Sequence, residues 1–192
     1  MNQPKIVVSS ESMQSEDKYD VIYSNILFVN LIREEAADDN EEEEDEAEDK
    51  VDELIPHDAF LSYYVDYYLS QYENGNFSQF VYNTGADFEV IDWIIDGLKK
   101  MGSTEHLALL QKQVEVLEAM DEVVLEAFIE SDYFGANPIR DLLNNDSFFT
   151  LKEDLIDLNA TWLKTHPDLL VLSTDEMYDY AEELLDKKIE RD

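Results

Sequence analysis

The sequence predicts an all-α protein that folds as an irregular single-domain helical bundle. Its strongly apolar segments repeat at the three- or four-residue spacing of a helix, and none alternates over the length of a strand. Hydrophobic residues make up 44% and aromatic residues 11% of the 192 residues, an ordinary composition for a protein with a packed core. A chain of this length suits one domain with tails.

The chain is extremely acidic, with 47 acidic and 13 basic residues and a net charge of −34. Because the apolar content is normal, we expect the carboxylates to cover the surface of a folded body. This charge excludes direct binding to nucleic acid or to an anionic membrane as a leading function and favours a basic protein partner. Adaptation to high salt is the competing explanation, and the many tyrosines and phenylalanines disfavour it.

The sequence contains no cysteine, which excludes disulfides, zinc–thiolate sites and thiol nucleophiles. The apolar run near the amino terminus, residues 6–8, is too short for a signal peptide, and no segment is long enough to span a membrane. We therefore expect a cytoplasmic protein.

Composition divides the chain into five parts. Residues 1–15 are rich in serine and have little apolar content, and we expect a mobile tail. A helix follows over 16–37, which packs on the core or on a second copy of the chain. Residues 38–50 form an acidic linker, for which a solvated spacer is favoured over loose capture of a basic partner. The helical core domain covers 51–168, and 169–192 form a C-terminal helical extension.

The core is organised around a tyrosine-rich helix that begins just after Pro56. Its aromatic side chains recur every four residues, in an apolar band broad enough to be covered on more than one side. The band contains Phe60, Tyr64, Tyr68 and Tyr72. We expect Asn74 and Gly75 to end this helix in a left-handed cap, and a second short helix to fold back and close at Gly85.

Local start and end signals place the next two helices. A helix over 87–101 ends at Gly102, where glycine readily takes a left-handed conformation. Ser103 or Thr104 is expected to cap the following helix. That helix continues to about residue 129, with a bend or break near Asp121.

The last third of the chain shows the same kind of signal. Pro138 is expected to begin a short helix, and a further helix ends before Pro167, because the residue before a proline disfavours helix. Residues 169–172 form a short apolar bridge to the final helix. Ser173 and Glu176 have capping-box spacing and open that helix.

Two helices carry acidic side chains at helical spacing on their outer faces. The first stripe consists of Glu115, Glu118, Glu122, Glu126 and Glu130. The second stripe consists of Asp175, Asp179, Glu183 and Asp186, beside Glu182 and Glu190. Like charges one helical turn apart cost about 0.2–0.5 kcal/mol each, where Glu–Lys pairs would stabilise. The stripes indicate partner-binding faces that mimic phosphates. An acidic protein that fills exposed positions with Glu and Asp is the alternative.

No arrangement in the sequence indicates catalysis, a metal or a cofactor. The three histidines, His57, His106 and His166, are far apart and form no metal-ligand pair. With 47 carboxylates, pairs at any spacing arise by chance, so none identifies a general acid and base. The sequence has neither a phosphate-binding glycine loop nor a nucleophile motif. We therefore expect a binding protein and no enzyme.

Three landmarks, in the same order, resemble the bacterial DNA-mimic protein family, whose members are small, acidic and all-helical. The first follows the tyrosine-rich helix, the second is a glycine at a helix junction, and the third is a His-Pro-acid turn. The matching residues are Asn74, Gly75, Phe77, Gln79, Phe80, Asn83 and Gly85, then Gly102, then His166 and Pro167. Members of the family usually carry a second glycine where this chain has Asn76.

We interpret the matching residues as structural, because a turn that locks two helices explains them without a ligand. The resemblance implies that the protein is a homodimer. It also implies a partner, a basic DNA-binding protein of the helix-turn-helix regulator class, whose DNA-binding face the protein occupies. An immunity or chaperone-like protein that neutralises a basic toxin or nuclease is the alternative. The identity of a co-purifying partner would separate the two.

Overall fold

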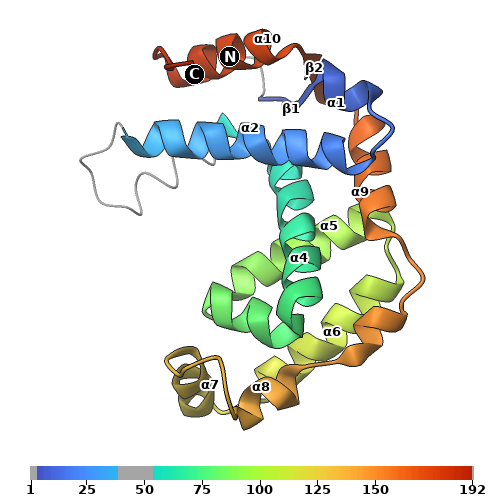
Figure 1. Ribbon diagram of the computed structural model, residues 1–192, viewed down its shortest axis with the longest axis vertical. Coiled ribbons are helices and arrows are strands. Elements are labelled where there is room, and N and C mark those ends of the chain that lie inside the picture. Colours follow the sequence, from blue (N-terminus) through green and yellow to red (C-terminus); the bar gives the residue numbers. More distant parts are fainter. Residues whose placement is uncertain (1–3, 39–53, 192) are drawn as a thin grey trace. The chain divides into compact units, whose positions relative to one another are not determined.

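The computed structural model describes residues 4–38 and 54–191, and it is predominantly helical (Figure 1). The all-α prediction is confirmed, with one small two-stranded sheet added to it. The chain divides into two compact units, with the boundary inside helix α4 (His57–Thr84). Unit 1 comprises residues up to 63 together with 156 onwards, and unit 2 comprises 64–155. Residues 39–50 of the predicted acidic linker lie outside the described residues.

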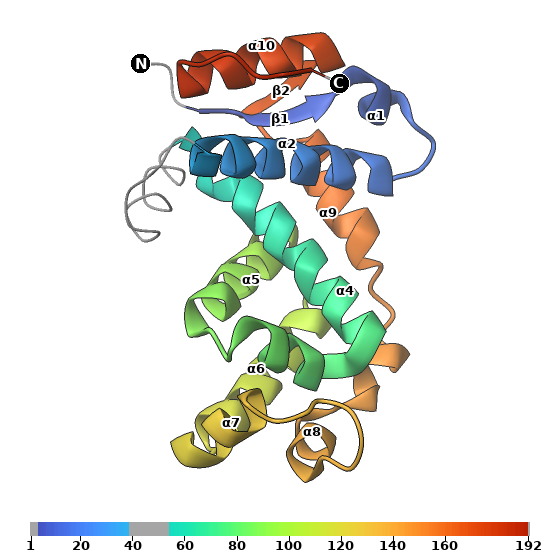
Figure 2. The same ribbon diagram turned by 60° about the vertical axis from the view of Figure 1, so that its left-hand side comes forward.

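Unit 1 joins the two ends of the chain. Strand β1 (Ile6–Ser9) pairs in parallel with β2 (Leu169–Leu172), with Ile6 opposite Leu169. The strand pair lies between the helices α2 (Tyr19–Asp38) and α10 (Thr174–Leu185) (Figures 1 and 2). The remaining elements of the unit are α1 (Ser10–Gln14), the first part of α4, and α9 (Leu155–Lys164) apart from its first residue.

Two sequence predictions for unit 1 were wrong. Within the expected mobile tail, residues 6–14 form β1 and α1, and the expected bridge over 169–172 is a strand. Ile6, Val7 and Val8 are completely or almost completely buried. A four-residue strand that is buried on both faces shows a continuous apolar run and no alternation, which is why periodicity did not reveal it.

Buried polar side chains connect the helices of unit 1. Asn25 of α2 donates through Nδ2 to the Ala59 carbonyl (3.0 Å). The hydroxyl of Ser62 donates to Oδ1 of Asn159 (2.8 Å), and Asn159 Nδ2 donates back to the Ser62 carbonyl (3.0 Å). Because an unpaired buried polar group is costly, these reciprocal bonds favour a single packing of α4 against α9.

The His-Pro-acid turn has a structural role in unit 1. Nε2 of His166 lies 2.9 Å from Oδ2 of Asp58, and Nδ1 accepts the backbone N–H of Asp168 (3.2 Å). The carboxylate of Asp168 pairs with Lys5 (2.5 Å), and its carbonyl accepts the N–H of Ile6 (3.2 Å). The turn therefore positions the start of β2 beside β1.

Unit 2 contains the rest of α4 and five further helices. They are α5 (Phe88–Met101), α6 (Glu105–Glu118), α7 (Glu122–Ile129), α8 (Pro138–Leu143) and the 3-10 helix η1 (Asp146–Thr150). Three members of the predicted aromatic band of α4, Phe60, Tyr68 and Tyr72, are buried, whereas Tyr64 is half-buried. The ring of Tyr72 stacks on Phe148 of η1 at 4.6 Å between centroids. The break between α6 and α7, expected near Asp121, is confirmed.

Helix α4 is kinked where its predicted end lies. Asn76, not Asn74 or Gly75, has the positive φ, 68°, and its ψ of −169° is extended, so no left-handed helical cap forms there. Its Oδ1 accepts the N–H of Phe77 (2.8 Å) and of Asn145 (2.9 Å), bonds that help Asn tolerate a conformation which usually favours glycine. A Cβ on Gly75 would lie 2.8 Å from the Cβ of Gln79, which cannot rotate away, so this position favours glycine.

The cap of α6 comes from a distant part of the chain. Gly102 ends α5 in a left-handed conformation, as predicted, but the Thr104 side chain makes no capping bond to α6. Glu153 replaces it: its carboxylate accepts the N–H groups of Thr104 (2.7 Å) and Glu105 (2.9 Å) and the hydroxyl of Ser103 (2.6 Å). A carboxylate at a helix N-terminus satisfies its free donors and complements its dipole.

Within the described residues, no helix is both long enough and apolar enough to cross a membrane.

Candidate partner-binding surface

The first predicted stripe lies on the surface of unit 2, and we call it the α6–α7 acidic face. All five of its side chains are exposed. They are Glu115, Glu118, Glu122, Glu126 and Glu130. Among the residues that the structure describes, none of the five forms an ion pair. Even Lys112, one turn before Glu115, does not pair with it.

The helix break divides this face between two helices. Asp121 caps α7 by accepting the N–H of Val123 (3.0 Å), so α6 and α7 are separate helices. Glu115 and Glu118 lie on α6, whereas the remaining three lie on or at the end of α7. The regular rise of one continuous helix therefore does not set the spacing across the whole face.

The inner sides of α6 and α7 hold the face in place. Gln113 is buried and donates through Nε2 to the Leu143 carbonyl (2.5 Å). Phe128 is buried against Tyr82, with ring centroids 5.8 Å apart, and the Tyr82 hydroxyl donates to the Ser131 carbonyl (2.9 Å). Val124, expected on the apolar inner face, is 40% exposed, since the short α7 turns only Phe128 fully inward.

The second predicted stripe lies in unit 1, and we call it the α10 acidic face. Its four side chains, all exposed, are Asp175, Asp179, Glu183 and Asp186. Basic residues that follow α10 partly neutralise this side of the helix. Arg191 pairs with Asp179 (2.6 Å) and with Glu182 (3.3 Å), and Lys188 also pairs with Glu182. Glu182, expected on the outer face, is buried under these contacts.

The titration of Glu182 reflects this neutralisation. The hydrogen bond from the Lys188 ammonium lowers the pKa of Glu182 to about 2, with smaller contributions in the same direction from the Ile189 N–H and Arg191. Burial acts in the opposite direction. A shallow groove beside it is lined by residues of both charges. They are Asp179, Glu182, Glu183, Asp186, Lys187 and Lys188.

The residues that match the family landmarks lie at helix ends and in the α4 kink. Gln79 and Asn83 both donate to Oε1 of Gln71, at 3.1 and 2.7 Å, and so link the two halves of α4. Phe77 and Phe80 are fully buried. Gly85 and Gly102 have φ of 64° and 78°, which only glycine adopts readily. These contacts support a structural role for them.

Two of the histidines predicted to be structural have specific partners. His106 is buried, with Nδ1 3.3 Å from the Tyr68 hydroxyl; burial lowers the pKa of His106, and the nearby Glu153 acts in the opposite direction. His166 forms the turn beside Asp58. Within the described ranges, no group of three or more His, Asp or Glu side chains is arranged to hold a metal ion.

One exposed aromatic side chain of unit 2 was not predicted from the sequence. Phe134, in the loop between α7 and α8, is 79% exposed. The sequence does contain one indication of it. An aromatic pair, Tyr133 and Phe134, directly precedes Gly135 in a predicted turn. An apolar residue in a loop is not periodic, so the helical pattern carries no information about it.

Comparison with known proteins identifies the family. The family model described as DMP19-like protein matches residues 52–166, which is more than half of the chain. The match includes all of unit 2 and only parts of unit 1, and it excludes both strands and α10. Comparisons with curated proteins and with solved structures give no match. The family model confirms the resemblance that the three landmarks indicated, and the chain belongs to the DMP19-like protein family.

Proposed function

We propose that this protein is an acidic DNA mimic that occupies the DNA-binding face of a basic partner, a helix-turn-helix transcription regulator. The family supports DNA mimicry as the mode of action. The observation that carries the proposal for this chain is the α6–α7 acidic face, where five carboxylates are exposed and unpaired. Its residues substitute for phosphates, and the α10 acidic face contributes second. The proposed activity is binding, without catalysis.

The charge of unit 2 is of the right size for this role. Residues 64–155 contain 18 acidic and 5 basic residues, a net charge of −13. At one charge per roughly 1.7 Å of duplex axis, this equals about 22 Å of DNA. That length suits the part of a half-site which one recognition helix and its flanking phosphate contacts cover.

The energetics of the face also support a partner. Glu122, Glu126 and Glu130, on and at the end of α7, are spaced at four residues, where like charges destabilise a helix by about 0.2–0.5 kcal/mol per pair. A basic surface would remove this repulsion on binding and would be steered toward the face at a rate that falls with salt. Direct binding to nucleic acid is opposed by the same charge.

We propose further that the protein acts as a cytoplasmic homodimer. Helix-turn-helix regulators are commonly two-fold symmetric and read two half-sites, so a symmetric dimer would present one acidic face to each recognition helix. Analytical ultracentrifugation at moderate salt tests this part, and a species with the mass of one chain, 22.3 kDa, would contradict it.

The central experiment captures the partner and then tests competition. The full-length protein is used as bait in an extract of its native host at moderate salt, and the captured partner is mixed with its own operator in a gel-shift assay. We expect the protein to release the operator in proportion to its concentration. A partner that binds protein and operator together contradicts mimicry, and a nuclease held over its active site supports the immunity alternative.

A matched pair of variants locates the site. Glu118→Gln, Glu122→Gln and Glu126→Gln together remove three charges from the face and should weaken competition at least about tenfold. The control removes three exposed charges elsewhere in unit 2, by Glu73→Gln, Glu89→Gln and Asp92→Asn. Equal losses in both variants would show that only total charge matters and that this face is not the site.

A further inference from the structure

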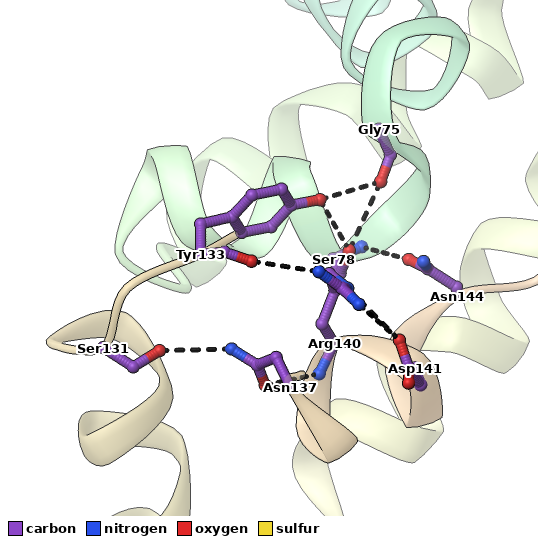
Figure 3. A network of polar contacts seen from close by, with 8 residues as sticks. All are labelled: Gly75, Ser78, Ser131, Tyr133, Asn137, Arg140, Asp141 and Asn144. Atoms are coloured by element: carbon purple, nitrogen blue, oxygen red, sulfur yellow. Dashed lines mark hydrogen bonds and ion pairs between the residues drawn. The ribbon is translucent and has the colours of Figure 1, made fainter. Parts of the chain in front are cut away.

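The loop between α7 and α8, residues 131–137, is held rigidly against α4. The hydroxyl of Tyr133 donates to the Gly75 carbonyl (3.0 Å) at the α4 kink and lies 3.0 Å from the Ser78 hydroxyl (Figure 3). Its ring packs on that of Tyr82, with centroids 5.1 Å apart. One side chain in the middle of the loop is thus fixed by polar and aromatic contacts to a buried part of unit 2.

The two ends of the loop are also tied. Asn137 donates through Nδ2 to the Ser131 hydroxyl (3.2 Å), and its Oδ1 accepts the N–H of Arg140 (3.1 Å) (Figure 3). The guanidinium of Arg140 donates to the Tyr133 carbonyl (3.1 Å) and lies over the Tyr133 ring at 6.0 Å. These bonds close the loop on itself and on α8, so its backbone has few alternative conformations.

Phe134 projects from this fixed loop into solvent. At 79% it is the most exposed of the large apolar side chains that the structure describes. Its N–H donates to Oδ1 of Asp132 (3.1 Å), and its ring is perpendicular to that of Tyr133, with centroids 5.6 Å apart. Gly135 follows with φ 90°. A single exposed apolar residue is common on protein surfaces. Here, however, hydrogen bonds hold the loop at both ends and in the middle. Neither packing in the core nor a flexible backbone therefore explains why the Phe134 ring is exposed.

The nearest charged residues to Phe134 in the sequence are acidic. Glu130 and Asp132 are exposed on the same segment, and α7, with the acidic face, lies beside α8 in both views of the fold (Figures 1 and 2). Arg140 is the basic residue of this region, and its charge is offset by Asp141 at 3.0 Å. The charged side chains close to Phe134 in the sequence are thus mainly acidic and exposed, and the nearby arginine is already paired.

We infer that the 131–137 loop is a preformed docking element, which inserts Phe134 into an apolar pocket bordered by lysine and arginine side chains on the protein partner. The inference rests on the proposed function, because it assumes a basic protein as the occupant. Rigid aromatic side chains are the usual anchors of protein interfaces, and a loop that is already ordered loses little entropy on binding. Carboxylates alone imitate phosphates on any DNA-binding face, so Phe134 supplies the selectivity that charge cannot.

The test uses two helical peptides of equal length and equal positive charge, one with a leucine face and one with serine at those positions. Each is titrated by calorimetry into the full chain. We expect the wild-type protein to bind the leucine peptide about tenfold more tightly, the scale of one aromatic anchor. Phe134→Ala should abolish this preference. Phe149→Ala is the matched control, since Phe149 is 61% exposed on η1 and should leave the preference unchanged. No preference in the wild type, or equal loss in both variants, overturns the inference.

A second variant tests the preformed loop separately from the ring. Tyr133→Phe removes the two hydroxyl contacts and keeps the aromatic packing, so we expect faster amide exchange in residues 131–137 and a several-fold weaker affinity for the leucine peptide. Faster exchange with unchanged affinity overturns the role of rigidity. The proposed function fails independently, if the captured partner binds this protein and its operator at the same time. It survives if only the peptide preference is missing.

Discussion

The two acidic faces of this protein look alike in sequence and differ in their electrostatic state. On α10, the nearby residues Lys188 and Arg191 pair with Glu182 and Asp179. On α6 and α7, no described lysine or arginine pairs with any of the five glutamates. One face is partly neutralised by its own chain, and the other retains its full charge.

The difference leads us to expect that the unpaired stripe is the better binding face for a basic partner. The pKa of Glu182 is lowered to about 2 mainly because the Lys188 ammonium already donates a hydrogen bond to it. A basic partner would have to displace such contacts on α10, whereas it would displace only water and ions on α6 and α7. The family match covers α6 and α7 and excludes α10, in keeping with this distinction.

The largest expected effect comes from reversing the charge of each face in turn. Glu118→Lys, Glu122→Lys and Glu126→Lys together should weaken binding of the captured partner by about a hundredfold or more, because attraction becomes repulsion. Asp175→Lys, Asp179→Lys and Glu183→Lys should weaken it by less than about tenfold. Competitive fluorescence anisotropy measures both, and circular dichroism checks that both variants fold. If the α10 variant has the larger effect, the two faces have been assigned the wrong way round.

The next effect concerns the cap that supports the α6–α7 acidic face. Glu153→Ala leaves the N-terminal amides of α6 without their acceptor and should lower the free energy of unfolding by about 1–2 kcal/mol, as measured by urea denaturation. Glu115→Ala on the same helix removes an exposed carboxylate without an ion pair and should change it by less than about 0.5 kcal/mol. Similar values for the two variants would mean that Glu153 is not a working cap.

This cap also predicts a dependence on pH. Burial by itself would raise the pKa of Glu153, but the hydrogen bonds from Ser103, Thr104 and Glu105 outweigh it and lower the pKa from 4.5 to about 2. A lowered folded-state pKa means that the stabilisation is complete above about pH 4.5 and is lost as the pH falls toward 2. The loss of stability over this range should be smaller in Glu153→Ala than in the wild type.

A smaller effect should follow from removing the neutralising residues of α10. Lys188→Ala with Arg191→Ala leaves Asp179 and Glu182 unpaired, so we expect the melting temperature to fall by a few degrees and amide exchange to increase in α10. In this variant the α10 acidic face lacks these ion pairs and so resembles the α6–α7 acidic face. Lys152→Ala with Lys164→Ala, which removes two charges elsewhere, is the control. An unchanged amide exchange rate in α10 would show that these ion pairs do not stabilise the helix, and that the two acidic faces do not differ in this respect.

The smallest expected effect comes from a single substitution that should change stability and partner binding in opposite directions. Glu126→Lys replaces two repulsive Glu–Glu spacings on α7 by attractive ones and should stabilise the protein by about 0.5 kcal/mol. The same change should weaken partner binding, because it places a positive charge in the face. A variant that is more stable and binds equally well would show that the glutamates of α7 only solvate the surface.

Much of unit 2 followed from local sequence signals. The aromatic band of α4, the end of α5 at Gly102, the break at Asp121 and the start of α8 at Pro138 were all predicted. Each depends on residues within one or two helical turns, where spacing and backbone preference act directly. Exposure of the Glu residues on α6 and α7 followed in the same way, since carboxylates opposite an apolar face point to water.

The sequence by itself therefore determined the helical class, the family and the large negative charge. Only the tertiary structure decided which charges stay unpaired and which elements lie side by side. Ile6 pairs with Leu169, and Glu153 caps a helix 49 residues before it in the chain. Asn76 is stabilised in its positive-φ conformation by the N–H of Asn145. Such contacts join distant residues and leave no period or local motif, because their free energy comes from burial and hydrogen bonding that exist only after the chain has folded.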